Sequence, residues 1–201
     1  MGYSEFTLKK VKNDFNLTII ENENFTSDVK EAEISDHLAA TLDVNVPLAL
    51  AINTEKARSE LIIINVLLEL KTIFKNELSI FSGTEFNVDK QKNLNGFCDY
   101  IISNSPEQLF LNSPIITIVE AKNENIISGF GQCISEMIAS KIFNDQEGES
   151  TSAIYGAVTS GSVWKFLKLE NNTVYIDLKE YHINDIDKIT GILSAMVKKN
   201  V

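Results

Sequence analysis

An acid and a lysine stand two residues apart at the end of one apolar run of this 201-residue sequence. The run covers residues 115–121. Glu120 is its last residue but one, and Lys122 follows it directly. Because successive side chains of a β-strand point to opposite faces, a strand here places the carboxylate and the ammonium on the same face. An isolated Glu-x-Lys at a strand end is most often a solvated ion pair, so its meaning depends on the residues that join it.

A second acid, Asp99, stands among apolar neighbours in the preceding β-type run, residues 96–103. If this run pairs with residues 115–121 as a hairpin, Asp99 faces Glu120 across the sheet. Two such carboxylates form a hard-oxygen site suited to Mg²⁺ or Mn²⁺, whose other ligands are waters and substrate phosphate oxygens. Beside that metal, Lys122 is placed to orient or deprotonate a water and to neutralise charge on a phosphoryl group.

Two predicted helices bring further polar residues. Glu60, in a helix over residues 54–75, is followed at i+3, i+4 and i+7 by isoleucine, isoleucine and leucine, which predicts that it lies on an apolar face. A carboxylate there needs a partner, and Lys122 or a metal-bound water would supply one. In the second helix, Gln132 and Glu136 stand one turn apart after two glycines that allow close backbone approach.

The order of the predicted elements is typical of an α/β core with a mixed sheet between helices. Helices are expected over residues 54–75, 125–144 and 184–198, and strands over 78–88, 96–103, 115–121, 153–159, 163–169 and 173–178. Before them, only a short strand within 15–20 and a short helix over 35–42 are indicated. We therefore divide the chain into an N-terminal extension packed on the core, residues 1–52, and a main domain, residues 53–201.

The positions of these residues on their elements resemble the PD-(D/E)XK nuclease superfamily over roughly residues 54–180. An acid on a leading helix, an acid on one strand, an acid-x-lysine pair on the next strand and a glutamine on the following helix make the resemblance: Glu60, Asp99, Glu120-x-Lys122 and Gln132. The stretch 158–166, with Thr159-x-Gly161 and Trp164-x-Phe166, is similar to a strand pair in the nuclease domains of type I restriction subunits.

The resemblance implies a restriction-endonuclease-like three-layer core and Mg²⁺- or Mn²⁺-dependent hydrolysis of phosphodiester bonds in nucleic acid, with DNA favoured. It implies that Asp99 and Glu120 hold the metal, that Lys122 is the catalytic lysine, and that Glu60 and Gln132 complete the catalytic group. A homodimer is compatible with it, since many nucleases of this fold pair their sites to cut both strands. The alternatives are a catalytically inactive module of the same fold, which binds protein or DNA ends, and a small-molecule phosphodiesterase.

Charge and composition limit the partners. The net charge of −10, from 28 acids against 17 lysines and one arginine, argues against a non-specific nucleic-acid coat and against a binder of anionic membranes. Cys98 and Cys133 have no ligand-spaced partners, which argues against a zinc site. Because the sequence has no signal peptide and no apolar run long enough to span a membrane, we expect a cytoplasmic protein with reduced thiols.

Overall fold

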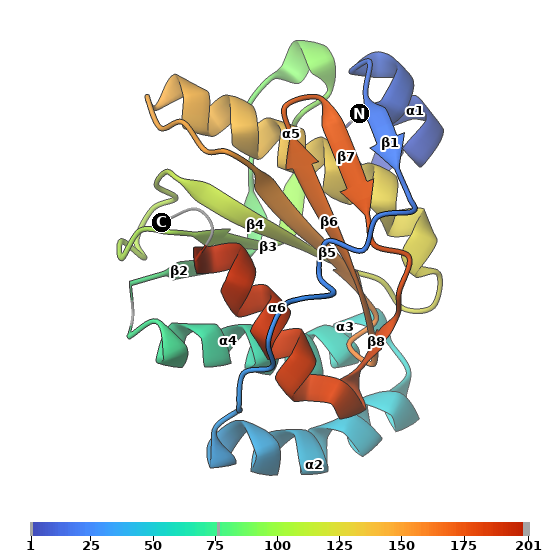
Figure 1. Ribbon diagram of the computed structural model, residues 1–201, viewed down its shortest axis with the longest axis vertical. Coiled ribbons are helices and arrows are strands. Elements are labelled where there is room, and N and C mark those ends of the chain that lie inside the picture. The colour runs from blue at the N-terminus through green and yellow to red at the C-terminus, as the bar shows by residue number, and fades with distance from the viewer. Residues whose placement is uncertain (1, 76, 199–201) are drawn as a thin grey trace.

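A mixed β-sheet forms the centre of the chain in a computed structural model that describes residues 2–75 and 77–198 (Figure 1). In the described residues the strand order is β1-β7-β6-β5-β4-β3-β2, and β8 pairs with β6. The strands are β1 Thr18–Ile20, β2 Ser79–Glu85, β3 Phe97–Ser103, β4 Ile115–Ala121, β5 Ile154–Thr159, β6 Val163–Glu170, β7 Thr173–Ile176 and β8 Tyr181–His182. The pairs β4–β5 and β1–β7 are parallel, and the other neighbours are antiparallel.

Helices cover both faces of this sheet (Figure 1). One face carries α5, with α1 packed on it, and the other carries α4 and α6, with α2 outside α4. The helices are α1 Leu8–Asp14, α2 Asp36–Ile52, α3 Glu55–Arg58, α4 Ile64–Ile73, α5 Phe130–Gln146 and α6 Ile186–Lys198. The α/β class with a mixed sheet flanked by helices, expected from the sequence, is confirmed.

The sheet separates two hydrophobic cores, and β4 contributes to both. Ile118 packs in the core on the α5 side, whereas Ile116 and Val119 pack in the core on the α4 and α6 side. Every residue of β4 is buried. A strand that is buried on both faces reads as a continuous apolar run, which explains the pattern of residues 115–119. It also means that an acid at the end of this strand has little access to water.

The first fifty residues supply parts of both layers. β1 pairs with β7 at the edge of the sheet, while Tyr3 and Phe6 are buried in the core on the α5 side. The helix expected over residues 35–42 begins there, with the Ser35 hydroxyl accepting a bond from the Leu38 N–H at 3.2 Å, but it continues to Ile52. The sequence analysis did not predict α1, whose Thr7 hydroxyl accepts from the third residue of the helix at 3.2 Å.

The helix expected over residues 54–75 begins where predicted but is not uniform. Thr54 caps it by accepting from the Ala57 N–H at 3.1 Å. A π-helical turn, η2 (Ser59–Ile63), then separates α3 from α4. A π-helical turn holds more than 3.6 residues, so it rotates the side chains before it relative to those after it. The positions that face the core therefore differ from those of a regular α-helix.

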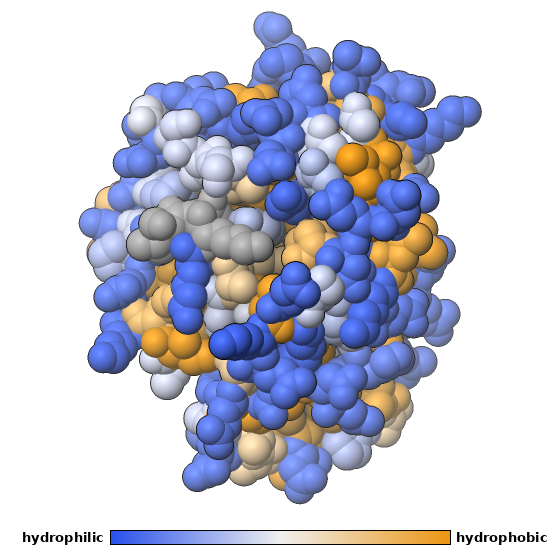
Figure 2. All heavy atoms as spheres, viewed as in Figure 1, coloured by the Kyte–Doolittle hydropathy of each residue, from blue (hydrophilic) through white to orange (hydrophobic). Residues whose placement is uncertain are grey.

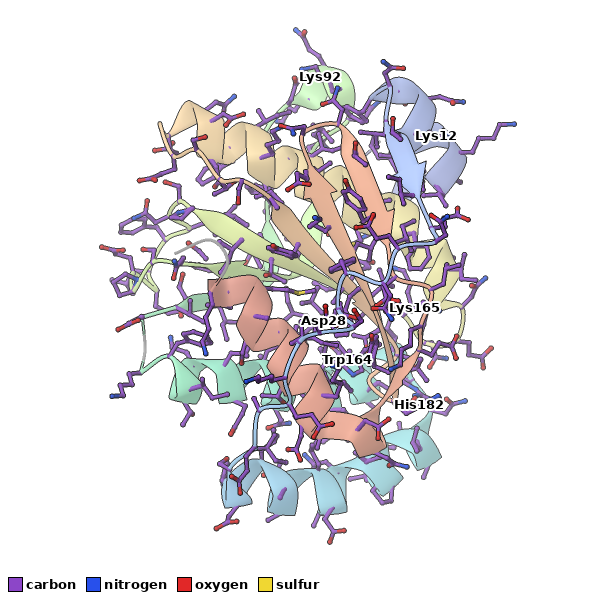
Figure 3. All side chains as sticks on the ribbon, in the orientation of Figure 1. Lys12, Asp28, Lys92, Trp164, Lys165 and His182 are labelled. Carbon is purple, nitrogen blue, oxygen red and sulfur yellow. The ribbon has the colours of Figure 1, made fainter. Side chains whose placement is uncertain are left out.

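The turn between β5 and β6 is tight and closely packed. Gly161 has a φ of 78°, and the Trp164 indole N–H donates to its carbonyl at 3.1 Å. Figure 3 places Trp164 and Lys165 on β6 beside His182 of β8. The outer surface in the same view is mainly hydrophilic (Figure 2). Among the helices of the described ranges, none is long and apolar enough to cross a membrane.

Candidate active site

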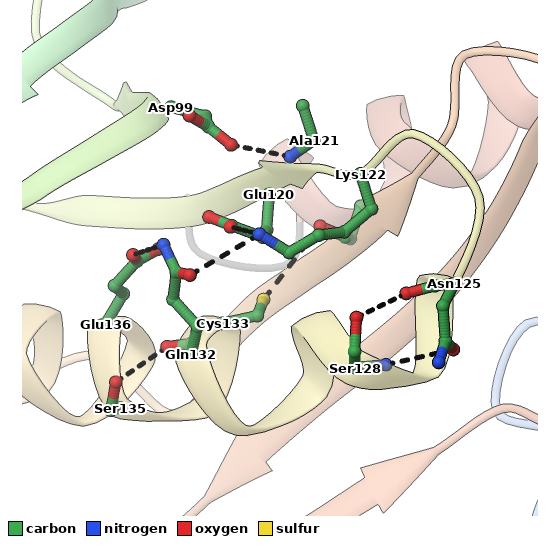
Figure 4. A network of polar contacts seen from close by, with 11 residues as sticks. Asp99, Glu120, Ala121, Lys122, Asn125, Ser128, Gln132, Cys133, Ser135 and Glu136 are labelled. Atoms are coloured by element: carbon green, nitrogen blue, oxygen red, sulfur yellow. Dashed lines mark hydrogen bonds and ion pairs between the residues drawn. The ribbon is translucent and has the colours of Figure 1, made fainter. Parts of the chain in front are cut away.

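The acid and the lysine at the end of β4 do lie on the same side of the sheet, facing α5 (Figure 4). The Lys122 ammonium contacts Oε1 of Glu120, and the Lys122 N–H donates to the carbonyl of Thr159 in β5 at 2.8 Å. The Glu120 side chain is 1% exposed, whereas that of Lys122 is 22% exposed. The carboxylate is therefore sealed inside the fold, and the ammonium stands between it and solvent.

Residues of α5 extend this contact into a chain of polar groups. Lys122 Nζ donates to Oε1 of Gln132 at 3.4 Å, and Nε2 of Gln132 donates to Oε1 of Glu136 at 3.0 Å (Figure 4). The approach of α5 depends on Gly129, because a Cβ there would lie 2.7 Å from Val158 and 3.1 Å from Lys122 Cγ. The glycine that the sequence marked as a point of close approach thus lets the helix reach the lysine.

Asp99 joins the group from β3. Its Oδ2 accepts a bond from the Ala121 N–H at 2.8 Å, which fixes the carboxylate beside the end of β4. The antiparallel register pairs Tyr100 with Val119, as the predicted hairpin requires, so the next position along each strand is Asp99 and Glu120. Residues two apart on a regular strand face the same side of the sheet. Cys98 packs in the core on the α5 side, whereas Tyr100 packs in the opposite core, so the regular alternation of β3 is interrupted at Asp99.

The electrostatics of the group are dominated by burial and by the excess of acids. Burial, with a further contribution from Asp99, raises the pKa of Glu120 to about 8, although Lys122 opposes the shift. Burial and the nearby Glu120 raise the pKa of Glu136 well above its usual range. Burial disfavours the Lys122 ammonium, but attraction to Glu120 outweighs this and raises the pKa of Lys122. The lysine is therefore a cation near neutral pH.

The donor set fits a divalent cation. Oε2 of Glu120 and Oε2 of Glu136 are both buried with no hydrogen-bond partner. Once Glu120 is deprotonated, its unpartnered oxygen, among three acids and one ammonium, leaves negative charge that a cation would neutralise. Within the ranges that the structure describes, no three His, Cys, Asp or Glu side chains form a ready metal cage. Mg²⁺ needs none, because one or two carboxylates with waters and phosphate oxygens complete its shell.

Glu60 does not join this group, and the expectation that it lies on an apolar face is wrong. Its side chain is 65% exposed, and its carboxylate pairs with Lys56 at 3.7 Å. The reason is the π-helical turn of η2, which contains Glu60 and breaks the regular spacing to the isoleucines that follow. An exposed carboxylate also has no need of the lysine or the metal-bound water that the sequence analysis assigned to it.

The structure adds two acids to the group found by sequence. Glu136, noted in the sequence only as standing one turn after Gln132, is buried. Glu55, in the first turn of α3, acts electrostatically on Lys122 and helps to raise its pKa. Glu55 follows the capping residue Thr54 at the start of α3, and Arg58 of the same helix donates to the Ser160 carbonyl just after β5, which holds α3 near the strand ends.

The group opens to solvent where β4 ends. Asp99, Lys122 and Gln132 are each partly exposed there. Two hollows lie elsewhere: one of about 500 Å³ beside Tyr181 and Lys188, and one of about 410 Å³ between α2 and the start of α6. None of the three site residues lines either hollow. We place the chemistry at the strand ends, because the perturbed carboxylates and the lysine converge there.

A search with the sequence finds no matching family model and no matching curated protein.

Proposed function

We propose that this protein is a metal-dependent nuclease of the PD-(D/E)XK type, which hydrolyses phosphodiester bonds in nucleic acid, with DNA favoured. The observation that carries the proposal is the buried Glu120, with one unpartnered oxygen, held between Asp99 and the Lys122 ammonium. This arrangement supplies both the negative charge that binds a divalent cation and a fixed cation for a phosphate.

Each residue has a distinct role in this proposal. Asp99 and Glu120 hold Mg²⁺ or Mn²⁺, which when bound stabilises charge on the phosphoryl oxygens and activates a water. Lys122 donates hydrogen bonds to the attacking water or to a non-bridging phosphate oxygen. Because its pKa is raised, it acts as a charged donor and not as a proton acceptor. Gln132 accepts from Lys122 and so fixes the direction of the ammonium.

Hydrolysis itself is a single displacement at phosphorus. Water forms the new P–O bond and gives up a proton to solvent, the bond to the leaving nucleotide oxygen breaks, and that oxygen takes up a proton from solvent. The chain contributes position and charge to this step, and no covalent intermediate with a side chain is required.

A catalytically inactive member of the same fold is the second candidate. It is favoured by the absence, in residues 2–75 and 77–198, of a ready-made cage of three or more metal-binding side chains. The net charge of −10 points the same way, because a polynucleotide substrate is itself an anion. Such a module would keep the buried polar group as a structural ion pair and would bind its partner without cutting it.

Calorimetric titration with Mn²⁺ and Mg²⁺ at low salt tests the proposal. We expect binding at millimolar concentrations or tighter, and we expect Asp99→Asn and Glu120→Gln to abolish it. Glu124→Gln is the matched control, since Glu124 is exposed and belongs to the loop after Lys122. Metal-dependent cleavage of single-stranded and duplex DNA is then measured for the same proteins. Metal binding unchanged by both site substitutions would overturn the assigned ligands.

A further inference from the structure

Glu136 on α5 is an acid of the polar group that neither holds the metal nor contacts the substrate in the proposed reaction. It is fully buried, its Oε1 accepts from Nε2 of Gln132 at 3.0 Å, and its Oε2 has no partner (Figure 4). A buried carboxyl with an unused oxygen destabilises a fold, so its presence calls for a physical explanation. The one bond that the side chain makes is the place to look for it.

This bond decides which way round the amide of Gln132 lies. An amide has an oxygen that accepts hydrogen bonds and a nitrogen that donates them. The Lys122 ammonium can only donate, so it must meet Oε1 of Gln132, and Nε2 is then left in need of an acceptor. Glu136, one turn further along α5, supplies that acceptor. In the part of the chain that the structure describes, Nε2 bonds to no other group.

The bond does not depend on the charge of Glu136. A protonated carboxyl keeps a carbonyl oxygen that accepts, so Oε1 can hold the amide whether or not Oε2 carries a proton. Burial and the nearby Glu120 raise the pKa of Glu136 well above its usual range, which favours the neutral form. The neutral acid accepts from Gln132 and adds no negative charge to the site. Glu136→Gln, which keeps the shape and the carbonyl oxygen, should therefore preserve the bond.

The Lys122 ammonium is held by its stem and by two of its three N–H bonds. The stem lies against α5, because a Cβ on Gly129 would be 3.1 Å from Cγ and 3.2 Å from Cε of the lysine. Oε1 of Glu120 and Oε1 of Gln132 accept from the ammonium. Among the described residues the third N–H has no acceptor, so it can reach a water or a phosphate oxygen. Because the ammonium is tetrahedral, the two acceptors together fix where this third N–H points.

We propose that Glu136 is a positioning residue for this site: its Oε1 holds the amide of Gln132 in the orientation that lets Gln132 fix the Lys122 ammonium. The inference rests on the proposed function for what the third N–H of the lysine does. The chain of bonds itself is present without metal or substrate. When the acceptor at Glu136 is lost, the Gln132 amide can turn and the ammonium is held by Glu120 alone. The lysine keeps its charge and the metal keeps its ligands, so only the direction of the donor changes.

Hydrogen exchange between the Lys122 ammonium and water, measured by NMR on ¹⁵N-lysine-labelled protein without metal, tests the inference. Lys122→Met identifies the signal. We expect exchange to be about 2- to 10-fold faster in Glu136→Met, where one hydrogen bond of the chain is lost, and to keep the wild-type rate in Glu136→Gln. Glu136→Asp withdraws the acceptor by one methylene group, so it should behave like Glu136→Met and replaces that variant if it does not fold. Ser140→Ala is the matched control and should keep the wild-type rate, since Ser140 is buried one turn along α5 and donates to the Glu136 carbonyl at 2.8 Å.

Single-turnover cleavage gives a second readout. We expect the rate to fall about 10- to 100-fold in Glu136→Met and to recover in Glu136→Gln, while Mn²⁺ affinity stays at the wild-type value in both. Wild-type exchange in Glu136→Met, or a Glu136→Gln protein that behaves like Glu136→Met, overturns the inference. Faster exchange in Glu136→Met, together with a wild-type protein that neither binds metal nor cleaves DNA, would support the positioning role and refute the nuclease. Metal-dependent cleavage that is insensitive to Glu136→Met would do the reverse.

Discussion

Glu120 and Lys122 lie two residues apart, and the ammonium of the lysine meets only one of the two carboxylate oxygens of the glutamate. The second oxygen, Oε2, is buried without a partner. The lysine therefore compensates the buried charge only in part, and the remaining electrostatic penalty appears as the raised pKa of Glu120. The same imbalance predicts how stability and metal binding depend on pH.

Stability should fall as the pH rises through the neutral range. The pKa of Glu120 is raised from its ordinary value of 4.5 to about 8, so the native state keeps its proton to higher pH than the unfolded chain does. Between these values the free energy of unfolding decreases with pH. In Glu120→Gln this decrease should be smaller by on the order of 2–4 kcal/mol. Urea unfolding at pH 5, 7 and 9 measures it, and Glu124→Gln should show the wild-type slope.

Metal affinity should rise over the same pH range. A divalent cation binds the deprotonated carboxylate, so at neutral pH it must displace the proton from Glu120. We expect the dissociation constant for Mn²⁺ to fall as the pH approaches about 8 and then to level off. Calorimetry in buffers of different ionisation enthalpy should show release of a proton on binding. A dissociation constant that is constant between pH 6 and 8 would contradict the role of Glu120.

Removing the lysine should separate binding from catalysis. In Lys122→Met the positive charge beside Glu120 is lost, so Mn²⁺ affinity should be kept or become tighter. The rate of cleavage should fall about 10²–10³-fold, as happens when a fixed donor to a developing oxyanion is removed. Single-turnover cleavage and metal titration on the same sample measure both effects. Cleavage by Lys122→Met at the wild-type rate would show that Lys122 has no catalytic role.

Glu60→Gln should have no effect on metal binding, because the carboxylate is exposed and pairs with Lys56. We expect the Mn²⁺ affinity of this variant to equal that of the wild type, and its stability to change by no more than about 0.5 kcal/mol. Asp99→Asn, measured alongside, is the variant in which we expect Mn²⁺ binding to be lost. A loss of metal affinity in Glu60→Gln would mean that the helix moves towards the strand ends when metal is bound.

Gly131→Ala should destabilise the fold, although alanine is the better helix former. A Cβ on Gly131 would lie 2.1 Å from the Phe6 carbonyl oxygen and 2.4 Å from the Thr7 carbonyl carbon. The N-terminal segment would have to move, at a cost of about 1–3 kcal/mol in the free energy of unfolding. Asp145→Ala, at an exposed position of the same helix, should change it by no more than about 0.5 kcal/mol.

The part of the site that follows from local geometry could be predicted from the sequence. The two-residue period of a strand places Glu120 beside Lys122, and the hairpin register places Asp99 beside them. Glu60 could not be placed, because one π-helical turn rotates it away and no spacing rule signals that turn. Residues 1–52 were expected to pack on the core, but the sequence does not show that the segment around Tyr3 packs on α5, beside Glu136, and the burial of Glu136 was therefore missed.

The close approach of Gly131 to the backbone of Phe6 and Thr7 links the segment over residues 2–7 to the group that we propose to be catalytic. Gln132, which fixes the direction of the lysine, is the next residue along α5. A displacement of residues 2–7 would therefore pass to Gln132 through a single peptide unit. A protein or small molecule that bound residues 2–7 could therefore inhibit the proposed cleavage without entering the site.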